Sequence, residues 1–203
     1  MPPIDPALVQ RAVDILRGGG LVAYPTDTVY GLAALPGNEQ AVARLFEAKR
    51  RDPGQPTPLL ITSQEMAPAT AGEVSDAALA LMAAFWPGAL TIILAKAQTF
   101  HSVAVDETVG LRVPDHPLPR ELSRLLGSPI TGTSANIAGG PEPLTAGDVQ
   151  AQLGDAVDLV IDGGRCPGGR PSPVVDCTES PPRIVRQGAI SEKELLRVLD
   201  ERG

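Results

Sequence analysis

The chain has 203 residues, of which 43% are hydrophobic and only 3% are aromatic, and its formal net charge is −7. This length and apolar fraction predict one globular domain, residues 1–203, with a core of Val, Leu, Ile and Ala. The acidic balance argues against broad, salt-driven binding to nucleic acid, although Lys49, Arg50 and Arg51 form a local basic cluster.

Membrane and secretory features are not evident in the sequence. No apolar run approaches the roughly 18 residues that span a bilayer, and the N-terminus lacks the pattern of a signal peptide. We therefore expect a soluble, cytoplasmic protein without a membrane partner. Cys166 and Cys177 could pair, but a reducing compartment favours free thiols. No Cys/His cluster has the spacing of a zinc site.

The first half of the chain alternates helices with strands. Asp5 followed by Pro6 is typical of a helix start, and the glycines at 18–20 end that helix. Apolar residues at helical spacing predict further helices after Asn38 and after Ser75. Short apolar runs predict strands at 21–24, 59–61, 90–94 and 109–113.

The second half is richer in short strands. We expect helices at 119–126, from Thr145 to about Gly154, and at 191–200 behind the capping box of Ser191 and Glu194. Strands are predicted at 130–133, 157–161, 173–175 and 184–186. Alternating elements followed by clustered strands predict an α/β fold with a mixed parallel and antiparallel sheet and flanking helices.

Three segments carry residues suited to binding. Residues 25–32 (PTDTVYGL) follow the first strand, and open α/β sheets place ligands at such strand ends, although a simple hydrogen-bonded turn is an equal alternative. Lys49 and Arg51 could meet phosphate or could simply complement a helix C-terminus. Residues 131–136 (TGTSAN) offer hydroxyl and amide groups for phosphate oxygens. Neither GxxxxGK[ST] nor GxGxxG occurs, so a nucleotide site here has another design.

The sequence does not place either histidine, His101 or His116, beside a nucleophile. Attack on a phosphorus of ATP would need no such pair, because positioning and charge neutralisation can suffice.

In order along the chain, these segments resemble the YrdC-like family of threonylcarbamoyl-AMP synthases. The resemblance runs from about residue 18 to residue 190, with the terminal helix beyond it. The segments that carry it are PTDTVYGL (25–32), KRR (49–51), WPGALT (86–91), VGLRVP (109–114), TSAN (133–136), SPVVD (172–176) and RQGAI (186–190). Each is weak alone, but the ordered set is specific.

The resemblance implies a twisted mixed sheet around a positively lined central cavity. It implies that threonine, bicarbonate and ATP give threonylcarbamoyladenylate and pyrophosphate, that Mg²⁺ accompanies ATP, and that a separate transferase complex passes the product's acyl group to tRNA. No metal ligand and no acid or base is assigned; Lys49 and Arg51 would position and neutralise the phosphate. The implied threonine contacts are Thr28, Tyr30, Thr62, Arg112, Gly132 and Ser172. The implied ATP contacts are Lys49, Arg51, Gln55, Thr108, Ser134, Asn136 and Arg186.

Three positions depart from the family pattern. Gln55 stands where many relatives have Asn, in a loop about two residues longer than theirs. Thr62 or Ser63 stands where relatives have His. Pro171-Ser172-Pro173 replaces the usual Glu-Ser-Thr.

Two other functions remain open. The same fold resembles proteins that bind double-stranded RNA, so the chain could contact tRNA weakly without catalysis, although its few aromatics disfavour base stacking. A domain that uses carbamoyl phosphate, as in hydrogenase maturation proteins, would normally be fused to modules that this sequence does not contain.

Overall fold

The computed structural model describes residues 5–53, 55–167 and 170–200, so both ends of the predicted 1–203 domain lie outside it. The helices are α1 (Pro6–Arg17), α2 (Glu39–Lys49), α3 (Ala67–Ala71), α4 (Asp76–Phe85), α5 (Pro117–Leu126), α6 (Ala146–Leu153) and α7 (Glu192–Asp200). The strands are β1 (Val22–Tyr24), β2 (Gly31–Ala33), β3 (Leu59–Leu60), β4 (Thr91–Ala95), β5 (Thr108–Arg112), β6 (Ile130–Thr131), β7 (Thr133–Ser134), β8 (Leu159–Val160), β9 (Val174–Asp176) and β10 (Arg183–Arg186). Short 3₁₀ helices lie at Gln64–Met66 and Gly154–Ala156.

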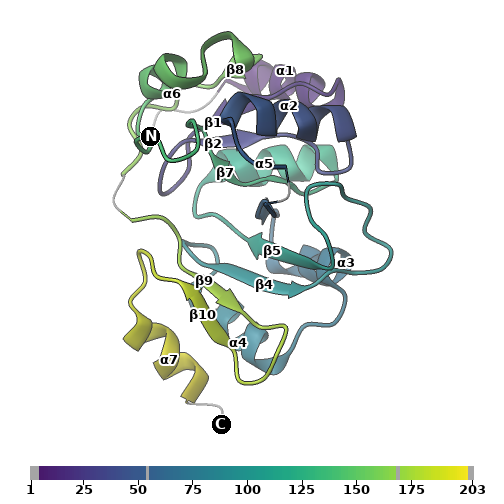
Figure 1. The fold of residues 1–203 in the computed structure, drawn as a ribbon, viewed down its shortest axis with the longest axis vertical. Coiled ribbons are helices and arrows are strands. Elements are labelled where there is room, and N and C mark those ends of the chain that lie inside the picture. Colours follow the sequence, from purple (N-terminus) through teal and green to yellow (C-terminus); the bar gives the residue numbers. More distant parts are fainter. Residues whose placement is uncertain (1–4, 54, 168–169, 201–203) are drawn as a thin grey trace.

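The strands form two mixed sheets rather than the single sheet expected. The smaller sheet has the order β7-β2-β1-β8 and the larger has the order β10-β9-β4-β5-β3-β6. Each sheet combines parallel pairs, such as β1 with β8 and β4 with β9, with antiparallel ones. The mixed α/β class is therefore confirmed. Figure 1 shows α1, α2, α5 and α6 around the smaller sheet, and α4 and α7 beside β9 and β10 at the other end.

One strand predicted at 130–133 is in fact divided at Gly132. β6 pairs with β3 in the larger sheet, whereas β7 pairs with β2 in the smaller one. A Cβ atom at Gly132 would lie only 2.7 Å from Leu60 Cδ2, so any larger residue here would shift either the Leu60 side chain or the crossing between the sheets.

The helix starts predicted at Asp5, Asn38 and Thr145 are confirmed by their side-chain caps, whereas the helix predicted from 119 begins at Pro117. The Asp5 carboxylate accepts from the Ala7 amide at 2.9 Å, and the Asn38 side chain accepts from the Ala41 amide at 3.0 Å. Thr145 and Asp148 form a reciprocal capping box at α6. β2 and α3 were not predicted, because each is short and lies in a segment without a clear apolar period.

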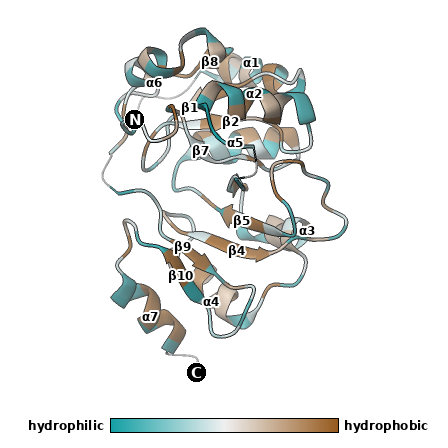
Figure 2. Cartoon of the chain, in the orientation of Figure 1, coloured by the Kyte–Doolittle hydropathy of each residue, from teal (hydrophilic) through white to brown (hydrophobic). Residues whose placement is uncertain are grey.

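Three groups of buried apolar residues hold these elements together. The largest lies between the larger sheet and α3, α4 and α7. The second packs α2 and α6 against the smaller sheet, and the third packs α1 and α5 against β1 and β2 of the smaller sheet and β3 and β6 of the larger one. Figure 2 shows the corresponding apolar colouring of β4, β5 and β9. Cys166 and Cys177 are buried free thiols, as expected. Among the described residues, no helix is long and apolar enough to cross a membrane.

Candidate functional site

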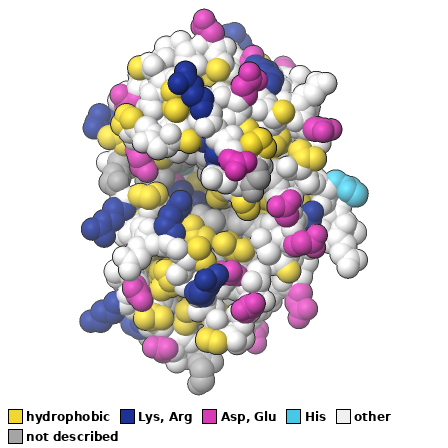
Figure 3. Space-filling view, in the orientation of Figure 1, with side chains coloured by type: hydrophobic (Ala, Val, Ile, Leu, Met, Phe, Trp, Pro, Cys, Tyr) yellow, Lys and Arg dark blue, Asp and Glu magenta, His cyan; other side chains and the backbone are white. Residues whose placement is uncertain are grey.

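A pocket of about 380 Å³ lies where residues of both sheets meet. Ser134 of β7 lines it from the smaller sheet, and Arg112 of β5 and Arg186 of β10 line it from the larger one. Figure 3 shows this face hollowed at mid-height, with Lys and Arg side chains along the edge of the hollow. The predicted site residues that line the pocket are Thr28, Arg51, Thr108, Arg112, Gly132, Ser134, Ser172 and Arg186.

The turn after β1 supplies Thr28. Thr26 Oγ1 donates to the Val29 carbonyl at 2.7 Å and accepts from the Thr28 amide at 3.0 Å, so Thr26 closes the turn. The two threonine hydroxyls lie 3.0 Å apart, and Thr28 faces the pocket. The segment can therefore be both a hydrogen-bonded turn and a part of the binding site, because Thr26 closes the turn and Thr28 lines the pocket.

Arg112 is held from three sides at the end of β5. Its Nε donates to the Gly88 carbonyl at 2.9 Å, one terminal nitrogen donates to Thr28 Oγ1 at 3.4 Å, and the other forms an ion pair with Asp27. The two side chains are only 9% and 15% exposed, so this pair is shielded from water. The guanidinium is consequently fixed in one orientation toward the pocket.

Arg51 follows α2 and reaches the pocket across the loop that precedes β3. Its guanidinium donates to Gln55 Oε1 at 3.1 Å, to the Pro56 carbonyl at 2.9 Å and to Thr133 Oγ1 at 3.4 Å. It also lies over the Phe46 ring, 5.7 Å from the centroid. Partial burial lowers the pKa of Arg51, although an arginine stays charged at physiological pH. Gln55, predicted as an ATP contact, instead supports Arg51 and does not line the pocket.

Lys49 lies behind the pocket wall rather than in it. Its ammonium, in a residue only 3% exposed, donates to the carbonyls of Ser134 and Asn136 and, at 3.4 Å, to Asn136 Oδ1. Burial, and secondarily the charge of Arg51, lowers the pKa of Lys49 to about 8. Asn136 also accepts from the Ser134 hydroxyl at 2.6 Å. In this structure Lys49 and Asn136 therefore hold Ser134 in place and do not themselves line the pocket.

Ser172 and Arg186 form the opposite wall. Arg186 Nε and one terminal nitrogen donate to the Ser172 carbonyl at 3.2 and 2.7 Å, and the same terminal nitrogen lies 3.4 Å from Ser172 Oγ. Burial lowers the pKa of Arg186. A Cβ atom at Gly188 would lie 2.3 Å from the Pro171 carbonyl oxygen, so the glycine permits this close approach.

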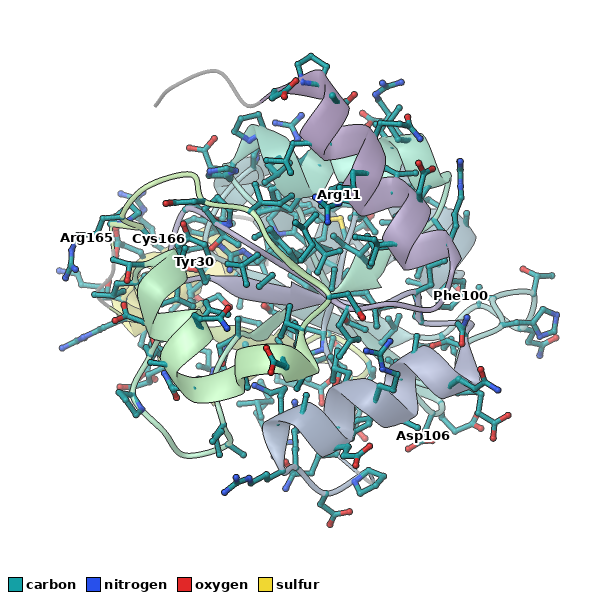
Figure 4. The ribbon with its side chains drawn as sticks, turned by 90° about the horizontal axis from the view of Figure 1, so that it is seen from above. Arg11, Tyr30, Phe100, Asp106, Arg165 and Cys166 are labelled. Carbon is teal, nitrogen blue, oxygen red and sulfur yellow. The ribbon has the colours of Figure 1, made fainter. Side chains whose placement is uncertain are left out.

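Tyr30 and Thr62, predicted as threonine contacts, do not line the pocket. The Tyr30 hydroxyl donates to the Gly164 carbonyl at 2.8 Å, and the buried ring packs in the same apolar group as Cys166. Figure 4 shows Tyr30 and Cys166 close together beside α6, with Arg165 at the periphery. The Thr62 hydroxyl donates to the Arg120 carbonyl at 3.1 Å. Both hydroxyls are used within the fold.

Four further polar lining residues were missed by the sequence analysis: Thr57, Thr91, Thr133 and Glu142. Thr57 is only 1% exposed, and its hydroxyl has no hydrogen-bond partner within the described residues. Thr57 lies directly before Pro58 and β3. Because the loop after Arg51 is longer than in relatives, an alignment started from β3 would have identified Thr57 more reliably than one started from Arg51. Thr91 closes the WPGALT segment that was already singled out.

The chemistry of the pocket is that of an anion site with hydroxyl groups. Three guanidinium groups (Arg51, Arg112 and Arg186) face it, and Glu142 is the carboxylate among its described lining residues. His116 Nδ1 accepts from the Leu118 amide at 3.2 Å and caps α5. No group of three or more His, Cys, Asp and Glu in the described part of the chain could hold a metal ion by itself.

Comparison with known proteins shows which family has this sequence pattern. The family model of Sua5, YciO and YrdC, described as "Telomere recombination", matches residues 14–188. The "Threonylcarbamoyl-AMP synthase" of Bacillus subtilis is 38% identical over 198 residues, 96% of this chain and 57% of its own length. The "Putative threonylcarbamoyl-AMP synthase" of Mycobacterium tuberculosis is 38% identical over 193 residues, 94% of this chain and 88% of its own length.

A solved structure extends the comparison to the fold. The structure of Sua5 from Pyrococcus abyssi complexed with L-threonine superposes with a TM-score of 0.88 at 38% identity, covering 94% of this chain and 56% of that one. The chain spans 57% of the length of the curated relatives that it matches first.

Proposed function

Because the chain belongs to the Sua5/YciO/YrdC family, we propose that it is a nucleotidyltransferase that makes L-threonylcarbamoyladenylate. The substrates are L-threonine, bicarbonate or CO₂, and ATP, and pyrophosphate is released. This would be the first step of threonylcarbamoyladenosine formation in tRNA, and a separate transferase complex would receive the product. The name of the relatives and the threonine bound to Sua5 support the substrate class.

The observation that carries the proposal is the convergence of three arginines and several hydroxyls on one pocket from distant parts of the chain. In the proposed reaction, the threonine amine and bicarbonate form a carbamate with loss of water. A carbamate oxygen then attacks the α-phosphorus of ATP, and the bond from that phosphorus to the pyrophosphate oxygen breaks. Both the carbamate and the triphosphate are anions, so a pocket lined by fixed cations suits them.

The threonine end of the pocket would lie at Thr28, Arg112 and Ser172. Arg112 is fixed by Asp27 and Gly88 and lines the pocket, so its remaining N–H groups would meet the carboxylate of an amino acid. Thr28 and Ser172 would offer hydrogen bonds to the remaining polar groups, and Gly132 lets the backbone approach closely.

The ATP end would lie at Arg51, Thr108, Ser134 and Arg186. Arg51 and Arg186 would neutralise negative charge that moves to the pyrophosphate as the bond breaks, and no acid or base among the side chains is required. Mg²⁺ would enter as part of the substrate, MgATP. A single nearby carboxylate such as Glu142 fits this, because Mg²⁺ is commonly held by one or two carboxylates together with substrate phosphates.

The direct test is incubation with L-threonine, bicarbonate, ATP and Mg²⁺, with pyrophosphate measured enzymatically and the adenylate identified by mass spectrometry. We expect pyrophosphate release that needs all three substrates, and much weaker release with valine, which leaves buried polar groups unpaired. Equal release with valine would contradict the assignment of threonine. RNA binding with no pyrophosphate release would instead favour the RNA-binding alternative.

A further inference from the structure

Thr91 and Ser172 present adjacent hydroxyls at one wall of the pocket. Thr91 begins β4, and Ser172 lies just before β9, the parallel neighbour of β4. The Thr91 amide donates to the Pro173 carbonyl at 3.0 Å, and the two hydroxyl oxygens lie 3.0 Å apart. The residues are only 2% and 6% exposed, and both line the pocket.

The direction of this hydrogen bond decides what Ser172 offers to a ligand. A serine hydroxyl has one proton and two lone pairs. Arg186 can only donate, and its terminal nitrogen, 3.4 Å away, already points at one lone pair of Ser172 Oγ. If Thr91 donates to the other, both lone pairs of Ser172 are occupied and its proton is free for the pocket.

The alternative direction would leave the site less well prepared. If Ser172 donated to Thr91, the free proton would instead belong to Thr91, and one lone pair of Ser172 would be left for the pocket. A carboxylate or carbamate oxygen can only accept, and Thr91 is the less exposed of the two residues, so the free proton serves such an oxygen better when it is on Ser172. Among the described residues, the Thr91 hydroxyl has no other hydrogen-bond partner, so nothing competes for its proton.

We propose that Thr91 is a positioning residue: it donates to Ser172 and so directs the Ser172 proton toward an oxygen of the amino-acid substrate. This inference rests on the proposed function, because it takes threonine as the ligand. Thr91 thereby acts on affinity for the amino acid without itself needing to touch the nucleotide.

The test is Thr91→Val, which keeps the shape of the side chain and removes only the hydroxyl. L-Threonine is titrated into the wild type and the variant by calorimetry without ATP, and ATP is titrated separately. We expect threonine binding to weaken roughly threefold to tenfold, the scale of one net hydrogen bond, with ATP affinity changed less than twofold. Thr91→Ser, which restores the hydroxyl, should recover most of the threonine affinity.

Thr70→Val is the matched control. Thr70 is 1% exposed and its hydroxyl donates to the Met66 carbonyl at 3.3 Å, outside the pocket. It should leave both affinities unchanged, while reporting the stability cost of a buried Thr→Val change in a thermal melt.

The outcomes separate two failures. Unchanged threonine affinity in Thr91→Val, an equal loss for threonine and ATP, or no recovery in Thr91→Ser would each overturn the role of Thr91. Absence of threonine binding and of threonine-dependent pyrophosphate release in the wild type would contradict the proposed function itself.

Discussion

At the scale of single residues, the pocket depends on side chains that are held by neighbours the sequence does not reveal. The types and order of Thr28, Arg112 and Ser172 could be read from the motifs, and all three do line one pocket. That Tyr30 and Thr62 do not line the pocket could not be foreseen, because their hydroxyls bond to carbonyls far away in the sequence, those of Gly164 and Arg120. The ligands assigned to these residues remain predictions.

The buried pair of Asp27 and Arg112 yields a first prediction. Asp27→Asn keeps a hydrogen-bond acceptor but leaves the Arg112 charge without a counter-ion in a shielded place, so the free energy of unfolding should fall by about 2 kcal/mol. Urea denaturation measures this. The control is Glu121→Gln, which breaks an ion pair with Arg124. The side chains of Arg124 and Glu121 are 58% and 41% exposed, so the loss should be less than about 1 kcal/mol. Similar costs for both variants would show that Asp27 is not a buried partner of Arg112.

Lys49 yields a pH-dependent prediction. Burial lowers the pKa of Lys49 to about 8 in the folded protein, whereas its ordinary value is 10.5. Between these values the unfolded chain holds a proton that the folded chain has released, so the Lys49 contribution to stability rises with pH. The wild type should therefore gain stability relative to Lys49→Met, on the order of 2 kcal/mol from pH 8 to pH 10. Denaturant titrations at several pH values measure the difference; a constant or shrinking difference would contradict the lowered pKa.

At the scale of elements, capped helices and the positions of most short strands were predictable, but the pairing of those strands was not. Asp5, Asn38 and Thr145 signal helix starts locally, because a cap bonds to amides only two or three residues away. β3, β6, β7 and β8 have two residues each, and their pairing is set by contacts with distant segments. The division of one predicted strand between two sheets is therefore a tertiary effect.

Gly132 yields the prediction at this scale. In Gly132→Ala the new methyl group would meet Leu60 Cδ2 at 2.7 Å, so either the crossing between the sheets or the Leu60 side chain must shift. We expect a loss of about 1–3 kcal/mol in the free energy of unfolding, together with reduced turnover because Ser134 moves with β7. Gly147→Ala in α6, where the nearest atom is 3.6 Å away, should be neutral or stabilising. Thermal melts and pyrophosphate assays of both variants compare the two positions.

At the scale of the whole molecule, the family followed from the ordered motifs and the mixed α/β class from the order of the predicted elements, whereas the structure was needed to show which candidate residues share one pocket. An acidic chain with a net charge of −7 gathers Arg51, Arg112 and Arg186 around one pocket, and no composition average reveals such a concentration. Because residues of both sheets line the pocket, a bound ligand would connect the two sheets.

That connection leads to a prediction for the unfolding of the entire protein. A ligand that binds only the folded state stabilises it by mass action, by about 2.7 kcal/mol at one hundred times its dissociation constant, so ATP and threonine should each raise the melting temperature of the wild type. Arg51→Gln should abolish most of the rise caused by ATP and keep the rise caused by threonine, because Arg51 lines the proposed ATP end. Arg50→Gln is the matched control, since Arg50 is the adjacent residue, is exposed and does not line this pocket, and it should keep both rises. If Arg51→Gln melts like Arg50→Gln with ATP present, then Arg51 only complements the end of α2, and the phosphate groups must be bound by other residues of the pocket.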